Sequence, residues 1–137
     1  MSACVMSENI RHRPKETGVR LLLVDDEPDL LSTLGEILAD HGYAVVSTWD
    51  GEDAVEIASV FNPTVLITDF RLPGMDGVTT IRKVRENCPR LKAFLVSGHI
   101  STTTRERAEE EHVESIFEKP LSVPELLHAL QTEATRN

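Results

Sequence analysis

Five short apolar stretches separated by helical patterns constrain the fold of this chain more than any other feature of its sequence. The first is a near-continuous apolar run, Leu21 to Val24, which is typical of a strand buried on both faces. Strands that alternate with helices predict an α/β fold, a parallel sheet with helices packed on both faces. The five stretches are Val19–Val24, Ala44–Thr48 (the weakest), Thr64–Thr68, Lys92–Val96 and Ser115–Phe117.

The segments between these stretches carry helix starts and stops. Pro28 suits the first turn of a helix, and Gly42 suits its left-handed end. Asp50 and Asp76 stand where the N-caps of the next two helices are expected, and Ser122 to Glu125 has the spacing of a capping box. The 3.6-residue period predicts the inward face of the first helix, namely Leu30, Leu31, Leu34, Ile37 and Leu38.

The segment Ser101–His112 differs from the other helical patterns. It offers only Ala108 as an inward apolar residue and is otherwise rich in threonine and glutamate, so we expect a loosely held helix. Trp49, at the end of the weak second stretch, and Cys88, at the end of a helix, are interpreted as packing residues.

The length of 137 residues predicts one domain, which we place at 19–131 between a flexible N-terminal tail (1–18) and a C-terminal tail (132–137). A short basic binding segment is the alternative interpretation of the first tail. The net charge of -9 argues against nucleic-acid binding by this domain. No stretch approaches the ~20 apolar residues of a membrane span, so no membrane insertion is expected. Cys4 and Cys88 are too few for a disulfide scaffold, so we expect two reduced thiols in a cytoplasmic protein.

Chemically active residues follow four of the five apolar stretches. Asp25 and Asp26 follow the first, Asp69 follows the third, Ser97 the fourth, and Lys119 stands after the fifth. The carboxyl ends of parallel strands meet at one edge of the sheet, where α/β proteins bind ligands. The sequence therefore predicts a site with three carboxylates, one hydroxyl and one ammonium group.

These groups together indicate phosphoryl chemistry. Three carboxylates repel one another unless a cation lies among them, and oxygen ligands favour Mg²⁺. One carboxylate can attack a phosphoryl group to give an aspartyl phosphate. The charge on that group can be stabilised by Mg²⁺, the Lys119 ammonium, the Ser97 hydroxyl and backbone N–H groups.

The chain resembles the receiver domain of two-component response regulators from about Arg20 to Leu130. The resemblance rests on Leu23-Val24-Asp25-Asp26-Glu27-Pro28, Thr68 to Gly77, Val96-Ser97-Gly98 and Glu118-Lys119-Pro120. It implies a flavodoxin-like fold, a doubly wound five-stranded parallel sheet of order 2-1-3-4-5 with five helices. It also implies a phosphoacceptor at Asp69, phosphoryl contacts from Ser97 and Lys119, a cis Lys119–Pro120 bond, and Mg²⁺ ligands. These ligands would be Asp26, Asp69, Asp25 through water and the backbone carbonyl of Arg71.

One departure from the family pattern concerns the output of the signal. The family commonly has a switching aromatic residue three positions before the lysine, where this chain has Ile116, with Phe117 next to it. Alternating strand side chains place these two residues on opposite faces. We therefore expect phosphorylation to reorder Gly98–His112, with Ile116 a passive residue at the switch position. Three residues near the site, Arg71, Gly98 and His99, are expected to modulate the lifetime of the phosphorylated state.

The resemblance implies a phosphorelay role without turnover of an external substrate. The phosphoryl donor would be a phosphohistidine of a sensor histidine kinase or of a phosphotransfer protein. We expect that the output partner is not encoded in this chain, and a homodimer is the further partner that we consider. Two alternatives are a pseudo-receiver that acts without phosphorylation and a Mg²⁺-dependent phosphatase. The phosphatase of haloacid-dehalogenase type needs a second Asp two residues after its nucleophile, where this chain has Arg71. A flavodoxin would need a phosphate-binding loop where Asp25-Asp26-Glu27-Pro28 stands.

Overall fold

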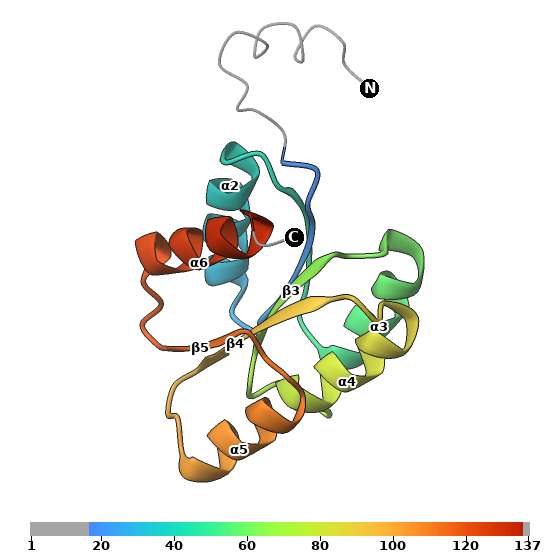
Figure 1. Cartoon of the computed structure of the whole chain (residues 1–137), viewed down its shortest axis with the longest axis vertical. Coiled ribbons are helices and arrows are strands. Elements are labelled where there is room, and N and C mark those ends of the chain that lie inside the picture. Colours follow the sequence, from blue (N-terminus) through green and yellow to red (C-terminus); the bar gives the residue numbers. More distant parts are fainter. Residues whose placement is uncertain (1–16, 136–137) are drawn as a thin grey trace, which may run out of the picture.

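The computed structural model describes residues 17–135. The strands in this range form one five-stranded parallel sheet in the order β2-β1-β3-β4-β5. The predicted α/β fold, strand order and five helices are confirmed (Figure 1). The strands are β1 (Arg20–Val24), β2 (Ala44–Thr48), β3 (Val65–Asp69), β4 (Lys92–Ser97) and β5 (Ser115–Glu118). The helices are α2 (Pro28–Asp40), α3 (Gly51–Phe61), α4 (Gly77–Asn87), α5 (Thr102–Glu110) and α6 (Val123–Thr135).

Helix starts follow the capping chemistry that the sequence predicts. The side chain of Asp50 accepts a hydrogen bond from the Asp53 N–H at 2.8 Å, and that of Asp76 accepts one from the Thr79 N–H at 2.8 Å. Each carboxylate satisfies an N–H group that the helix itself leaves free. Gly42, which follows α2, adopts a φ of 95°, a conformation that glycine reaches without strain.

Two hydrophobic cores lie on opposite faces of the sheet. Alternation along β1 sends Leu21 and Leu23 toward α2 and α6, whereas Leu22 and Val24 face α3, α4 and α5. In β5 the same alternation places Ile116 against the α3–α5 core and Phe117 against the α2–α6 core, which confirms their opposite orientation. The ring centroids of Phe117 and Phe94 are 6.2 Å apart.

Of the two residues that we expected to be packing residues, one is buried and the other is exposed. Cys88 is buried, as expected, and its Sγ lies 3.9 Å from the carbonyl oxygen of Ala58. The prediction for Trp49 is wrong, because 65% of its surface is exposed. It follows the edge strand β2 and precedes the N-cap of α3, so neither core reaches its side chain.

The structure describes only part of the two predicted tails. Helix α6 continues to Thr135, into the segment that we expected to be a C-terminal tail from residue 132. Residues 1–16 of the predicted N-terminal tail, Cys4 among them, lie outside the described residues. Thr17 is described, and its N–H donates to the carbonyl of Gly42 at 3.0 Å. Between residues 17 and 135, the helices are too short or too polar to cross a membrane.

Candidate functional site

The parallel register brings the predicted site residues to one edge of the sheet. Val24 lies beside Thr68, Asp69 beside Val96, and Ser97 beside Glu118. The residues that end β3 and β4, and those that follow β1 and β5, therefore meet at the carboxyl edge. The structure brings together the same set that the sequence predicts there, namely Asp25, Asp26, Asp69, Ser97 and Lys119.

Three of these residues form an acidic cluster. Asp25, Asp26 and Asp69 each offer a carboxylate oxygen, and the three oxygens lie within 4.8 Å of one another. Asp25 and Asp69 are buried, with 3% and 6% of their surfaces exposed, whereas Asp26 is exposed. A cluster with two buried members and one open side could hold a metal ion, and its oxygen-only donor set suits a hard cation.

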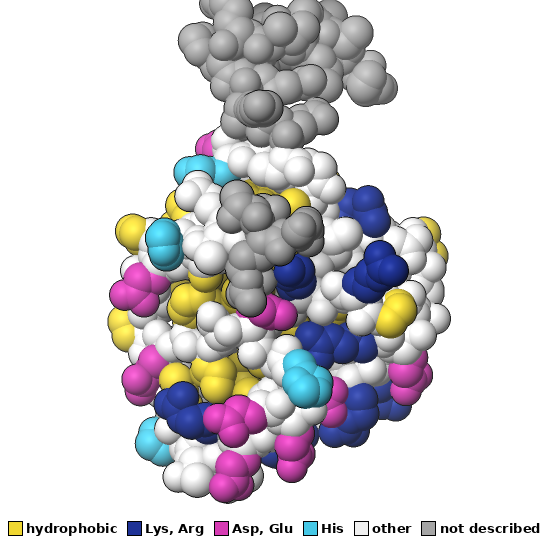
Figure 2. All heavy atoms as spheres, viewed as in Figure 1, with side chains coloured by type: hydrophobic (Ala, Val, Ile, Leu, Met, Phe, Trp, Pro, Cys, Tyr) yellow, Lys and Arg dark blue, Asp and Glu magenta, His cyan; other side chains and the backbone are white. Residues whose placement is uncertain are grey.

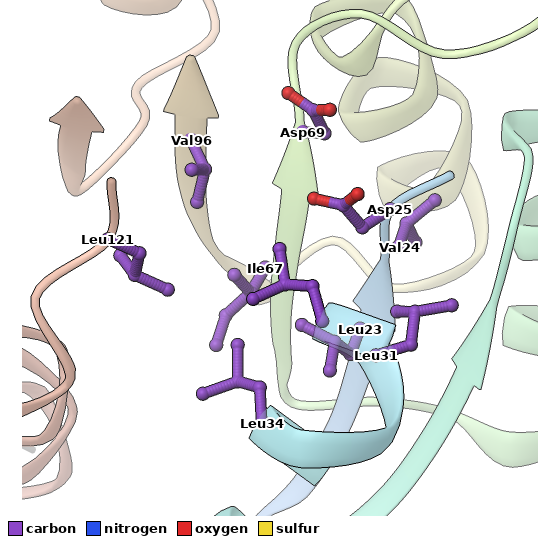
Figure 3. Close-up of a pocket in the computed structure, with 10 residues that line it drawn as sticks. Leu23, Val24, Asp25, Leu31, Leu34, Ile67, Asp69, Val96 and Leu121 are labelled. Carbon is purple, nitrogen blue, oxygen red and sulfur yellow. The ribbon is translucent and has the colours of Figure 1, made fainter. Parts of the chain in front are cut away.

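The two buried carboxylates lie above an apolar floor (Figure 3). A small cavity beneath them is lined by Leu23, Leu31 and Ile67 among other apolar side chains. This surrounding disfavours charge, so burial raises the pKa of Asp25, and the nearby charge of Asp69 raises it further. The Glu27 N–H, which donates to Asp25 at 2.9 Å, and Lys119 act in the opposite direction.

Lys119 supplies the positive charge of the site. Its Nζ lies 3.2 Å from Asp25 Oδ2, 3.2 Å from Asp69 Oδ2 and 3.3 Å from Glu27 Oε1. Burial alone would lower the pKa of Lys119, but the hydrogen bond to Asp69 and the charges of both aspartates raise it overall. The ammonium group is therefore held in its charged form. The Lys119–Pro120 peptide bond is cis.

Glu27 is a site residue to which the sequence analysis assigned no role. Its position directly after Asp25 and Asp26 was the available signal, but its contact with Lys119 joins residues that are 92 positions apart. The contact is exposed on the glutamate side, where 63% of the side chain is accessible. Glu27 therefore competes with the two buried aspartates for the same ammonium group.

The hydroxyl of Ser97 is turned toward its own loop. Its Oγ donates to the backbone carbonyl of His99 at 2.8 Å and accepts from the His99 N–H at 3.3 Å. Ser97 is 3% exposed, whereas Gly98 and His99 are exposed beside the site. Arg71 is exposed too, two residues after Asp69, and Ile116 is partly buried.

Close backbone packing fixes the loop that follows Asp69. The N–H of Phe70 donates to the carbonyl of Val96 at 2.7 Å, and the N–H of Gly77 donates to the carbonyl of Phe70 at 2.8 Å. A Cβ atom on Gly77 would lie 2.3 Å from the backbone oxygen of Asp69. The absence of a side chain at Gly77, the first residue of α4, therefore allows that helix to approach the end of β3.

The open parallel sheet, with an acidic cluster and a lysine at its carboxyl edge, defines a flavodoxin-like α/β protein whose cluster could hold a metal ion. A comparison with protein families matches residues 21–131 to the response regulator receiver domain, and the chain belongs to that family. The chain is therefore a receiver domain of the kind found in two-component signalling.

Relatives and solved structures agree with this assignment. The chain is 32% identical over 108 residues to a response regulator receiver protein of Anaeromyxobacter sp. (strain Fw109-5), covering 79% of this chain and 45% of that protein. It is 31% identical over 120 residues to the transcriptional regulatory protein TrcR of Mycobacterium tuberculosis, covering 88% of this chain and 47% of TrcR. A CheY-like receiver domain from Methanospirillum hungatei JF-1 has the same fold, with a TM-score of 0.81 at 22% identity, covering 85% of this chain and 93% of that one.

The chain spans less than half the length of three of the curated relatives that it matches. A cyclic di-GMP phosphodiesterase of Thermotoga maritima is 30% identical over 117 residues, and the match covers 85% of this chain but 31% of that protein. The similarity therefore concerns the receiver portion of proteins that carry other parts.

Proposed function

We propose that Asp69 accepts a phosphoryl group from a phosphohistidine on a sensor histidine kinase or a phosphotransfer protein. The observation that carries this proposal is the position of the Lys119 ammonium, 3.2 Å from both Asp69 and Asp25 within the acidic cluster. A carboxylate oxygen of Asp69 would attack the phosphorus atom, and the phosphorus–nitrogen bond would break with its electron pair on the imidazole. The product is an aspartyl phosphate.

The acidic cluster fits a magnesium ion. Asp26 and Asp69 would bind it directly and Asp25 through water, with the backbone carbonyl of Arg71 as a further oxygen ligand. When bound, Mg²⁺ supplies positive charge to the phosphoryl oxygens and relieves the repulsion among the carboxylates. The exposed side of the cluster, at Asp26, leaves room for a donor to approach.

Lys119 and Ser97 would stabilise the phosphorylated state in different ways. Lys119 is charged and already within hydrogen-bond distance of Asp69, so it can neutralise a phosphoryl oxygen with little movement. Ser97 now donates to the carbonyl of His99, so it must exchange that partner for a phosphoryl oxygen. This exchange would pull on the loop at Gly98 and His99, which leads into α5.

The output of the signal is then a change in Gly98–His112. Ile116 is β-branched and partly buried against the core, so it moves little and has no hydroxyl to exchange partners. Hydrogen exchange with and without the phosphoryl mimic beryllofluoride tests this idea, and the largest protection change is expected in Gly98–His112. The domain turns over no external substrate in this proposal, acts in the cytoplasm, and passes the signal to an output partner or to a second copy of the chain.

Intact-mass measurement with acetyl phosphate and Mg²⁺ tests the phosphoacceptor. The wild-type mass is expected to rise by one phosphoryl group, and the variant Asp69→Asn should stay unmodified. Asp50→Asn is the matched control, because Asp50 caps α3 and takes no part in the acidic cluster, so this variant should be modified like the wild type. Modification of Asp69→Asn to the wild-type extent would place the phosphoryl group elsewhere.

A further inference from the structure

Helix α5 lacks an apolar face large enough to hold it in place. Of its residues, only Thr104 and Ala108 are buried. Two such small side chains remove little apolar surface from water, so hydrophobic burial contributes little to its position. Figure 2 shows acidic side chains over the lower part of the molecule, at α5, close to the Lys and Arg side chains on the α4 side. Polar contacts between the two helices are therefore the main candidates for what holds α5.

Arg107 makes the central contact of this kind. Its Nη1 donates to Asp76 Oδ2 at 2.7 Å and its Nη2 donates to Asp76 Oδ1 at 3.3 Å, with Thr79 Oγ1 at 3.4 Å from Nη2. Paired bonds between a guanidinium and a carboxylate are strong and fix the geometry of both groups. The hydrogen bond to Asp76 raises the pKa of Arg107. Burial on its own would raise the pKa of Asp76, but the bonds from Arg107 and Thr79 outweigh it and lower that pKa.

The same guanidinium lies over an aromatic ring next to the phosphoacceptor. The Cζ of Arg107 is 5.8 Å from the centroid of the Phe70 ring, a cation–π distance. Phe70 follows Asp69 directly, and its backbone is bonded on both sides, to Val96 and Gly77. Arg107 therefore contacts the loop after Asp69 at its beginning, through Phe70, and at its end, through Asp76.

The far end of α5 has an anchor of its own. Arg85 on α4 donates to the backbone carbonyls of Glu111 and His112, and Arg82 pairs with the side chain of Glu111 at 3.1 Å. These contacts do not involve the Asp69 loop. The near end of α5 begins at Ser101, shortly after the loop of Ser97. Arg107, in the last turn of α5, thus ties the helix to the loop after Asp69, while Arg85 and Arg82 hold the residues that follow the helix.

We propose that Arg107 is a positioning residue that couples α5 to the phosphoacceptor loop and holds the helix in its resting arrangement. The inference rests on the proposed phosphorylation of Asp69. When Ser97 moves toward a phosphoryl group, the start of α5 shifts, and the contact of Arg107 with Asp76 and Phe70 is weakened. The free energy of that contact then opposes phosphoryl binding, and removing it must favour binding by the same amount.

Titration with beryllofluoride in the presence of Mg²⁺ measures this coupling. We expect Arg107→Ala to bind the phosphoryl mimic about three- to tenfold more tightly than the wild type, a coupling of ordinary size. Arg105→Ala is the matched control, because Arg105 is an exposed arginine on the same helix, and it should bind like the wild type. Arg107→Lys should fall between them, since lysine keeps the charge but loses the paired geometry.

A double-mutant cycle separates the coupling from a general loss of stability. Asp76→Asn keeps a capping side chain and removes the charge, so adding Arg107→Ala to it should change the mimic affinity less than Arg107→Ala does alone. Equal affinities of Arg107→Ala and Arg105→Ala, in a wild type that binds the mimic, would overturn the coupling while leaving the proposed function in place. A folded wild type that does not bind the mimic at all would overturn the proposed function, and the coupling with it.

Discussion

The close approach of Gly77 to the backbone of Asp69 predicts that a larger side chain at position 77 lowers the stability of the fold. In Gly77→Ala the new methyl carbon would lie 2.3 Å from the Asp69 backbone oxygen and 3.1 Å from Leu95 Cδ1, and carbon atoms of this kind essentially never come within 3.0 Å of a neighbour. The backbone next to Asp69 cannot yield easily, because the Phe70 N–H is bonded to Val96. Either α4 moves away from the sheet or the end of β3 is distorted.

The magnitude follows from two opposing effects. Overpacking of a tight core costs about 1–3 kcal/mol. Replacing glycine by alanine in a helix gains about 0.5–1 kcal/mol, because less backbone entropy is lost on folding. For Gly77→Ala we therefore expect a net loss centred on about 1 kcal/mol, and at most about 2.5 kcal/mol, in the free energy of unfolding. Gly35→Ala, inside α2, is the matched control, since nothing lies within 4 Å of its new carbon, and it should gain about 0.5–1 kcal/mol.

Urea denaturation of the wild type and both variants measures the two effects directly. The midpoint should fall for Gly77→Ala and rise for Gly35→Ala, with similar denaturant slopes in all three proteins. A displaced Asp69 should also slow phosphorylation by acetyl phosphate, since a shift near 1 Å at a reacting group costs up to about a hundredfold in rate. Equal stability gains in the two variants would show that the packing at Gly77 relaxes freely, and would refute the reasoning.

Three further predictions concern the site and its surroundings. Millimolar Mg²⁺ should raise the Tm of the wild type. Without Mg²⁺, the Tm of Asp26→Asn should be higher than that of the wild type, and Mg²⁺ should raise it less. A wild-type Tm that does not change with Mg²⁺ argues against the metal site. Arg71→Ala and His99→Ala should each change the half-life of the phosphorylated protein several-fold with little effect on folding, and three equal half-lives would dismiss that role. The pKa of Asp76 lies below its ordinary 3.8, so its stabilising charge is fully present above that pH and is lost as the pH falls through the lowered value. The stability difference between the wild type and Asp76→Asn should therefore be constant near neutral pH and shrink below about pH 4, as urea denaturation across pH can show.

The position of the candidate site could be predicted because it depends on local patterns. A strand buried on both faces needs an unbroken apolar run, so the end of the run marks the carboxyl edge of the sheet. Asp25, Asp69 and Ser97 stand at such ends in the sequence, and the parallel register brings them together. The same reasoning failed for Trp49, because an aromatic residue at a strand end carries no signal of whether its strand lies at the edge.

The contacts that the sequence could not predict join residues far apart in the chain. Glu27 meets Lys119 across 92 positions, and Arg107 meets Asp76 across 31. An arginine on a polar helix has the same local pattern whether it points to solvent or to a carboxylate. Which of the two occurs depends on how α5 is turned against α4, and that orientation is a property of the folded chain.

The weak apolar pattern of Ser101–His112 nevertheless predicts something about its behaviour. A helix whose position depends on large buried side chains, such as Leu34 and Leu38 in α2, can move only if it exposes apolar surface. Helix α5 depends instead on Arg107 and on the arginines of α4, and a partly exposed ion pair can exchange its partner for water at a cost of about 1 kcal/mol or less. Under the proposed function, a phosphoryl group at Asp69 would therefore have to offset this ion pair and the burial of two small side chains, Thr104 and Ala108, to move α5.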